Sequence, residues 1–216
     1  MKQLLSLICI FLACSQIWAQ ESRFIIGLDL TGSTTNHWGD FNRESVDPIQ
    51  GIYPGFNFEY FIQNHLSLKS GLAYEKKGIS YDAVASNISG TEVWNINHFI
   101  YYEYISIPLL LSYSTQGVIN FYANGGFFGG FLVKQISEYY SERDNTTNIE
   151  ELEDSSKKYD AGISIGAGIN KSFGKRFCID LGIRDNLGLV NIFLAESSGS
   201  LKTNSLGLVL ALKLKI

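Results

Sequence analysis

Hydrophobic and polar positions alternate strictly along one stretch of the chain, NSLGLVLALKLKI, which spans residues 204–216. Every second position from Leu206 to Ile216 holds a large aliphatic side chain, and the positions between them are small or charged. Successive side chains of a β-strand point to opposite faces, so this pattern predicts a strand with one bulky apolar face. A helical period of 3.6 would mix the two sets. No later segment could cover this face, which favours a lipid-facing strand that closes a barrel.

The same alternation recurs in seven other segments, so that eight strands are predicted. They cover residues 23–31, 52–62, 65–77, 99–114, 119–134, 159–170, 176–187 and 204–216. The connections alternate between long polar segments and short turns, as they do in outer-membrane barrels. Pro108 cannot donate a ladder hydrogen bond, and we expect it at a bulge or an unpaired site. The predicted fold is all-β, an eight-stranded antiparallel up-and-down transmembrane β-barrel.

A soluble eight-stranded barrel, such as a lipocalin-like carrier of an apolar ligand, is the alternative to a membrane barrel. It would turn its bulky face inward and cover its outside with Lys and Glu. In this chain the face opposite the bulky residues is mostly Gly, Ser, Ala and Asn, with isolated charges. That face would make a poor coat against water but would fill a narrow lumen. The pattern therefore favours the membrane barrel.

The first residues, MKQLLSLICIFLACSQIWAQ, are typical of a secretory signal peptide. Lys2 precedes a short apolar run over residues 4–13, and Ala19 provides the small residue before cleavage. We expect a signal peptide over residues 1–19 and one outer-membrane barrel domain over residues 20–216. A lipoprotein signal that ends at Cys14 is the alternative, although Phe11 is a poor match to the position that usually carries Leu.

Composition and charge exclude several classes of function. The chain has 216 residues, of which 45% are hydrophobic, and its formal net charge is −4. Loss of residues 1–19 removes Lys2 and no acidic residue, so the charge becomes −5. This mildly acidic balance argues against a nucleic-acid partner. After cleavage Cys178 remains as a lone cysteine, which excludes an intramolecular disulfide and a cysteine-based metal site. No cofactor motif is present.

Charged residues on the face opposite the bulky side chains are expected to point into the lumen. They are Asp29, Glu59, Lys69, Glu75, Asp160, Asp180, Arg184, Lys213 and Lys215. An eight-stranded barrel is just wide enough for side chains to fill its interior, and buried charges must pair or remain hydrated. We expect an ion-paired plug in which Arg184 and Lys69 bridge carboxylates such as Glu59, Asp160 and Asp180. A proton or ion path through the same residues is the alternative.

Three further groups of residues are weaker candidates for chemistry. The histidines His37, His65 and His98 have no metal-ligand spacing. His98 with Ser80 or Ser89 is the one pairing that an enzyme could use. The acidic segment 138–154 lacks the pattern of a calcium loop and is expected to be a solvated loop. Trp38, Trp94 and the tyrosines 101, 102 and 104 are assigned to an interfacial aromatic belt or to a contact with a partner at the loop tips.

Four motifs in order resemble the PorT-like outer-membrane β-barrel family of Gram-negative bacteria. They are EYISIPLLL at residues 103–111, the set Asp160, Gly162, Gly166 and Gly168, the segment RDNLGLVNI at residues 184–192, and the aliphatic final strand. The sequence departs from the family at Ser106, where Glu is usual, so a lumen ion pair made by that Glu is not expected. It also departs at Asp185, where an aromatic is usual, and at Ile216, where many outer-membrane barrels end in an aromatic.

An even number of strands places both termini on one side of the membrane, and the short turns on that side indicate that the N- and C-termini are periplasmic. The resemblance implies an outer-membrane protein. The named member of the family takes part in type IX secretion. We therefore expect a non-enzymatic barrel that lies in outer-membrane lipid and has a plugged lumen. Its extracellular loops would contact other envelope or secretion proteins. A narrow passive channel and an outer-membrane lipid-modifying enzyme are the alternative functions.

Overall fold

The computed structural model describes residues 23–40, 46–87, 89–90, 93–152, 156–174, 176–193 and 199–216. Within these residues the chain forms nine strands. They are β1 Phe24–Trp38, β2 Asp47–Gln63, β3 Leu66–Ser86, β4 Val93–Ser114, β5 Ile119–Ser141, β6 Thr146–Glu151, β7 Tyr159–Phe173, β8 Phe177–Gly188 and β9 Lys202–Lys215. The predicted signal peptide at residues 1–19 lies outside the described residues.

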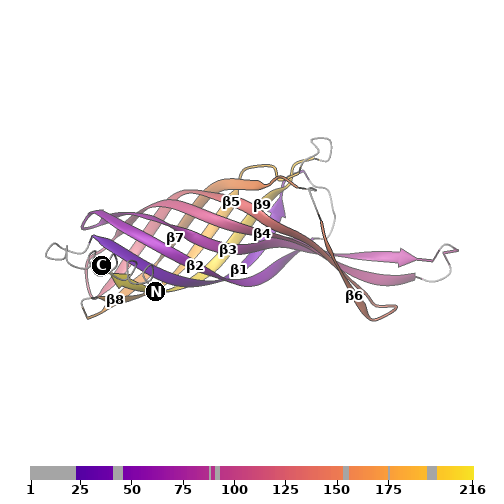
Figure 1. Cartoon of the computed structure of the whole chain (residues 1–216), viewed down its shortest axis with the longest axis horizontal. Helices are drawn as coiled ribbons and strands as arrows, with labels where there is room; N and C mark the ends of the chain where they lie inside the picture. The colour runs from indigo at the N-terminus through magenta and orange to yellow at the C-terminus, as the bar shows by residue number, and fades with distance from the viewer. Residues whose placement is uncertain are drawn as a thin grey trace, which may run out of the picture.

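Eight of the strands close into a ring of antiparallel neighbours (Figure 1). β1 pairs with β2 on one side and with β9 on the other, and the pairing of β4 with β5 completes the circle. β6 pairs with the far end of β5 and stands outside the ring. The predicted eight-stranded antiparallel up-and-down barrel is confirmed.

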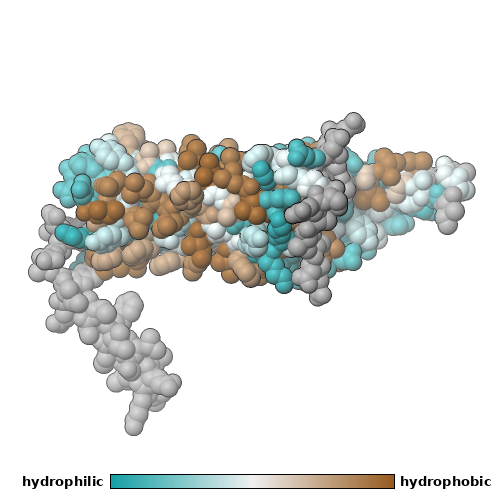
Figure 2. Space-filling view, turned by 90° about the horizontal axis from the view of Figure 1, so that it is seen from above, coloured by the Kyte–Doolittle hydropathy of each residue, from teal (hydrophilic) through white to brown (hydrophobic). Residues whose placement is uncertain are grey.

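The bulky face of each strand points outward, as predicted. On β9, Leu206, Leu208, Leu210 and Leu212 are each between 52% and 58% exposed. The residues that alternate with them are buried, with Val209 at 6% and Ala211 at 3% exposure. Figure 2 shows the result as a hydrophobic surface over the barrel. Among the described residues, none belongs to a helix that is long and apolar enough to span a membrane.

One end of the barrel carries the start of β1 and the end of β9, which pair at Ile25 and Lys215. We call this end the termini end and the opposite one the loop end. At the loop end β3, β4 and β5, with 21, 22 and 23 residues, continue past the ring. They form a long projection that β6 joins (Figure 1).

The predicted loops 32–50, 78–98 and 135–157 are therefore in part strands, which corrects the sequence prediction. β1 continues to Trp38, β3 to Ser86 and β5 to Ser141. The added part of β1 stays within the ring, where it pairs with both β2 and β9. Where β3 and β5 leave the ring they have no buried apolar face to maintain, so their alternation of apolar and polar residues fades. Backbone pairing with the neighbouring strand continues nevertheless, as in the pairs Ser86–Val93 and Ile96–Ser141.

The acidic segment 138–154 contains strand β6, where a loop was expected. A turn at residues 142–145 reverses the chain, and Asn145 adopts a positive φ of 51° there, a conformation that asparagine tolerates. Residues 146–151 then pair back along β5. All six are exposed, so the sequence has no alternation of buried and exposed positions that would predict this strand. Glu153 and Asp154 lie outside the described residues.

Pro108 lies where the pairing between β3 and β4 is interrupted, as expected. The pairs pass from Ser70–Leu109 directly to Ala73–Ser106. The hydroxyl of Ser70 donates a hydrogen bond to the carbonyl of Pro108 over 2.8 Å at this gap. The missing amide of the proline therefore disrupts no ladder bond.

Candidate functional site

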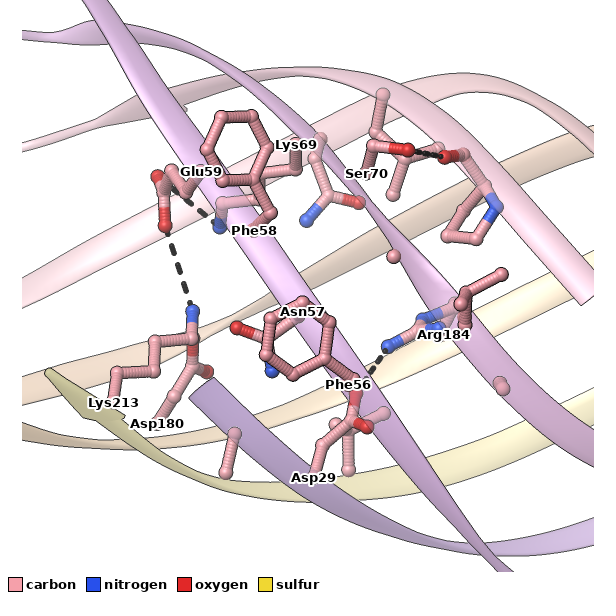
Figure 3. Close-up of a pocket in the computed structure, with 18 of the residues that line it drawn as sticks. Asp29, Phe56, Asn57, Phe58, Glu59, Lys69, Ser70, Asp180, Arg184 and Lys213 are labelled. Atoms are coloured by element: carbon pink, nitrogen blue, oxygen red, sulfur yellow. Dashed lines mark hydrogen bonds and ion pairs between the residues drawn. The ribbon is translucent and has the colours of Figure 1, made fainter. Parts of the chain in front are cut away.

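Charged side chains from five strands meet inside the termini half of the barrel (Figure 3). We call them the termini-end cluster: Asp29, Glu59, Lys69, Asp180, Arg184 and Lys213. Lys213 pairs with Asp180 and lies 3.6 Å from Glu59. Glu59 also lies 3.7 Å from Lys69, and Arg184 lies 3.4 Å from Asp29. Three acids and three bases are thus placed together, so their formal charges balance.

A cavity of about 60 Å³ lies within this cluster. Its wall also includes Asn57, Tyr122 and Asn124. A water molecule needs roughly 10–15 Å³ of such space, so the cavity has room for a few waters. The Nζ of Lys69 lies 3.9 Å from the centre of the Tyr122 ring, which adds a cation–π contact to the ion pairs. The arrangement fills the lumen with paired charges.

A second group of charges lies in the lumen nearer the loop end than the termini-end cluster. We call it the buried triad: Glu75, Lys77 and Asp160. Lys77 Nζ lies 2.9 Å from Asp160 Oδ2 and 3.7 Å from Glu75 Oε2. The side chain of Lys77 is 0% exposed. Lys77 is absent from the set of lumen charges expected from the sequence, because the predicted third strand ends at this residue. Lys77 follows Glu75 by two residues, so the alternation of a strand places it on the same face as Glu75 and Lys69. This shared face was the signal that could have identified it.

The expected bridges of Arg184 differ from those in the structure. Arg184 contacts Asp29, whereas Asp160 is held by Lys77 and Asp180 by Lys213. The expected contact between Lys69 and Glu59 is present. Lys215, at the termini end, donates to the hydroxyl of Ser172 over 3.0 Å. The strand tilt decides these partners, because it shifts equivalent positions of distant strands to different heights along the barrel.

Hydroxyl and amide groups complete the surroundings of Glu75. Ser106 donates a hydrogen bond of 2.8 Å to Glu75, and Tyr53 donates one of 3.3 Å. Ser106 is the position at which the PorT-like pattern usually has Glu. A glutamate there would lie beside Glu75, so the serine replaces a like-charge contact with a hydrogen bond.

An apolar cluster lies beside the triad, where the Nζ of Lys77 is 5.4 Å from the centre of the Tyr104 ring. Tyr102, Tyr104, Ile192 and Leu201 are each at most 3% exposed and pack together. Tyr102 and Tyr104 were assigned to an interfacial belt, and this assignment is wrong because their strand turns them into the barrel. The side chain of Asn191, in the RDNLGLVNI motif, accepts hydrogen bonds from the amides of Phe193 and Leu201 at 3.1 and 2.9 Å. Asn191 thereby holds Ile192 in place.

The structure gives His98 a different serine partner from those expected. Its Nε2 lies 2.7 Å from Ser137 Oγ, and its Nδ1 contacts the hydroxyl of Tyr81. Ser80 pairs with Phe99, and its hydroxyl donates to the carbonyl of Asp47. Ser137 is only 6% exposed, so its hydroxyl is closed to a lipid ester. The contact fixes β3, β4 and β5 to one another where they leave the ring.

A sheet projects from the loop end of the barrel (Figure 1). We call it the projecting sheet: residues 81–86 of β3, 93–98 of β4, 137–141 of β5, and β6. Directly paired residues of antiparallel strands share a face, and on one face Asn97 donates to Asp82 over 2.7 Å. The same face carries Val84, Val93 and Ile149, which are 69%, 65% and 70% exposed.

Neither metal-binding clusters nor disulfides are found in the described part of the chain. No group of three or more His, Cys, Asp or Glu side chains there is arranged to hold a metal ion. Cys178 is a free, buried thiol with 0% exposure.

Solved structures with a similar architecture are known. The chain is similar in structure to Neisserial surface protein A (NspA), with a TM-score of 0.50 and 14% identity over 91% of this chain and 99% of NspA. It also resembles OprG from Pseudomonas aeruginosa, with a TM-score of 0.44 and 11% identity over 91% and 97% of the two chains. For Ail, the attachment invasion locus protein of Yersinia pestis, the TM-score is 0.40 and the identity 11%, over 90% and 99%. No curated protein matches the sequence.

At 14% identity the similarity to NspA shows the fold alone. The sequence itself matches the model of a family, the outer membrane protein beta-barrel domain, over residues 18–194. This match covers most of the chain, including β1 to β8. The chain therefore belongs to the outer membrane β-barrel family, and it is a protein of the outer membrane.

Proposed function

We propose that this protein is a non-enzymatic outer-membrane barrel whose projecting sheet binds another protein of the cell envelope. The lumen supports a plugged barrel, because two groups of paired charges and an apolar cluster fill it in succession. In this proposal the termini face the periplasm and the loop end faces outward. The partner belongs to a secretion or envelope assembly, as the resemblance to the PorT-like family implies.

The projecting sheet carries this proposal. A strand needs roughly 9–11 residues to cross a bilayer, whereas β3, β4 and β5 have 21 to 23. About half of each strand is therefore not needed for spanning. Side-chain hydrogen bonds of 2.9 Å between Asn95 and Glu142 and of 2.7 Å between Asn97 and Asp82 order the extension. A rigid sheet that presents exposed Val84, Val93 and Ile149 is suited to a protein contact.

Site-specific photocrosslinking in whole cells tests the proposal. A photoreactive residue is placed singly at Val84, Val93 and Ile149, and at Phe127 as a control on the barrel wall, where the side chain is 68% exposed. The expected result is one and the same envelope protein captured from the three positions on the projecting sheet but not from Phe127. Capture of no common protein, or equal capture from Phe127, would overturn the proposal.

A shortened variant checks that the projection is the contact. The pair Tyr81–His98 lies at its base, so replacing residues 82–97 by a two-residue turn removes the tip of the β3–β4 hairpin and leaves the ring intact. The variant should keep its heat-modifiable migration on gels, which reports a folded barrel, and should lose co-purification of the captured protein. Undiminished co-purification would contradict the assignment.

A further inference from the structure

The outer wall of the barrel has a groove centred on Gly32, toward the loop end. Its volume is about 650 Å³, which is in the range of roughly 300–1,000 Å³ typical of ligand pockets. The groove is lined by residues of four adjacent strands: Gly32, Ser33, Thr34, Gln50, Gly51, Ile52, Ile183, Leu206, Gly207 and Leu208. It lies on the hydrophobic exterior and is separate from the lumen and from the projecting sheet.

The register explains why the wall is hollow at this point. Ile183 pairs with Leu208, Leu208 with Gly32, and Gly32 with Ile52, so these four residues form one row across β8, β9, β1 and β2. Three of them carry large side chains that are 57%, 57% and 75% exposed. At Gly32 an added Cβ would meet no atom within 4 Å. The missing side chain therefore leaves a slot between Leu208 and Ile52.

The rows on either side of the slot have different chemistry. The row nearer the termini is filled by apolar residues, since Leu30 pairs with Pro54 and with Leu210. The row nearer the loops places Thr34 between Gln50 and Leu206. Farther toward the loop end, Lys202 pairs with Trp38, and its Nζ lies 4.5 Å from the Trp38 ring. From the termini end toward the loop end, the groove is thus bordered by apolar side chains, then by the hydrogen-bonding side chains of Thr34 and Gln50, and then by the cation of Lys202.

We propose that this groove binds one acyl chain of lipopolysaccharide. The occupant follows from the position of the groove, because an opening on the wall of an outer-membrane barrel meets lipid. Apolar Leu208 and Ile52 contact the chain, Thr34 and Gln50 meet the polar linkage of the lipid, and Lys202 lies at the height of its phosphate. Asp185 lies at the same rim, where the amide of Asn204 donates to it over 2.9 Å. The choice of lipopolysaccharide rests on the proposed orientation, in which the loop end faces outward.

Lipid binding to purified protein tests the inference. The full-length barrel is delipidated in detergent and titrated with lipopolysaccharide or, in a parallel series, with phosphatidylglycerol, and bound lipid is counted by native mass spectrometry. Wild-type protein should hold one lipopolysaccharide molecule, and Gly32→Leu, which fills the slot, should weaken this binding at least tenfold. Lys202→Gln should weaken it less, because the acyl contacts remain.

The matched control is Gly129→Leu. Gly129 is an exposed glycine of β5, and an added Cβ there would also meet nothing within 4 Å. This variant should bind lipopolysaccharide like the wild type, and both glycine variants should retain heat-modifiable migration. Equal binding by wild type and Gly32→Leu would overturn the inference, as would preferential retention of phosphatidylglycerol. The readout does not involve the projecting sheet, so crosslinking to an envelope protein can fail while lipid binding succeeds.

Discussion

The ammonium group of Lys77 lies 2.9 Å from the carboxylate of Asp160, and both side chains are 0% exposed. The two residues are 83 positions apart in the chain, on β3 and β7, which are not neighbours in the sheet. Asp160 Oδ2 also accepts a hydrogen bond of 2.6 Å from Thr203 on β9. The contact therefore crosses the lumen and ties together opposite walls of the barrel.

Replacing Lys77 by Met should destabilise the barrel strongly. The change leaves Asp160 and Glu75 buried without a cation, and removal of one partner of a buried ion pair costs about 3–5 kcal/mol. Urea unfolding in lipid vesicles, followed on gels by heat-modifiable migration, measures the loss. Lys76→Met is the control, because Lys76 lies on the other face of β3, where its Nζ is 3.6 Å from the Tyr101 ring. Equal unfolding midpoints for the two variants would contradict the role of Lys77.

Adding Asp160→Asn to Lys77→Met should restore part of the lost stability. The second change removes a negative charge that the first leaves unpaired, so the two effects should not add. Coupling energies for contacting residues are about 0.5–3 kcal/mol. A double-mutant cycle in the same urea assay gives this energy. Strict additivity would mean that the two side chains do not interact.

Gly162→Ala should destabilise the pairing of β7 with β8. A Cβ at Gly162 would lie 2.0 Å from the carbonyl oxygen of Leu187, and backbone cannot yield as a side chain can. Overpacking of this kind costs roughly 1–3 kcal/mol. The comparison is Gly129→Ala, which meets open space and should unfold at nearly the wild-type urea concentration. A neutral Gly162→Ala would show that the strands can separate without cost.

Two exposed hydrophobic positions should respond differently to arginine. Leu210, in the middle of β9, is 52% exposed on the barrel wall, and Leu210→Arg should cost about 2–4 kcal/mol because the charge enters lipid. Val84 on the projecting sheet is 69% exposed, and Val84→Arg should cost little because it meets water. Urea unfolding in vesicles compares them. A similar cost at both positions would place Val84 in the bilayer as well.

The strand pattern was readable from the sequence because a membrane barrel must alternate its faces. Each strand has lipid on one side and a narrow lumen on the other, so a period of two runs through segments such as residues 204–216. The same period placed Glu59, Asp180 and Lys213 on the inner face, where the structure brings them together. Beyond the ring this constraint ends, which is why β6, residues 78–86 of β3, residues 93–98 of β4 and residues 135–141 of β5 do not follow from the sequence pattern.

The sequence by itself determined the number of strands in the ring, their order and, within the predicted strands, which face carries the bulky apolar side chains. Tertiary structure alone decided which lumen charges meet, such as Arg184 with Asp29 and Lys77 with Asp160. It also decided that Gly32 lies between Leu208 and Ile52 and leaves a groove. Alternation along a strand records only inward and outward directions, whereas height along the barrel depends on the tilt and stagger of all eight strands, which no single segment encodes.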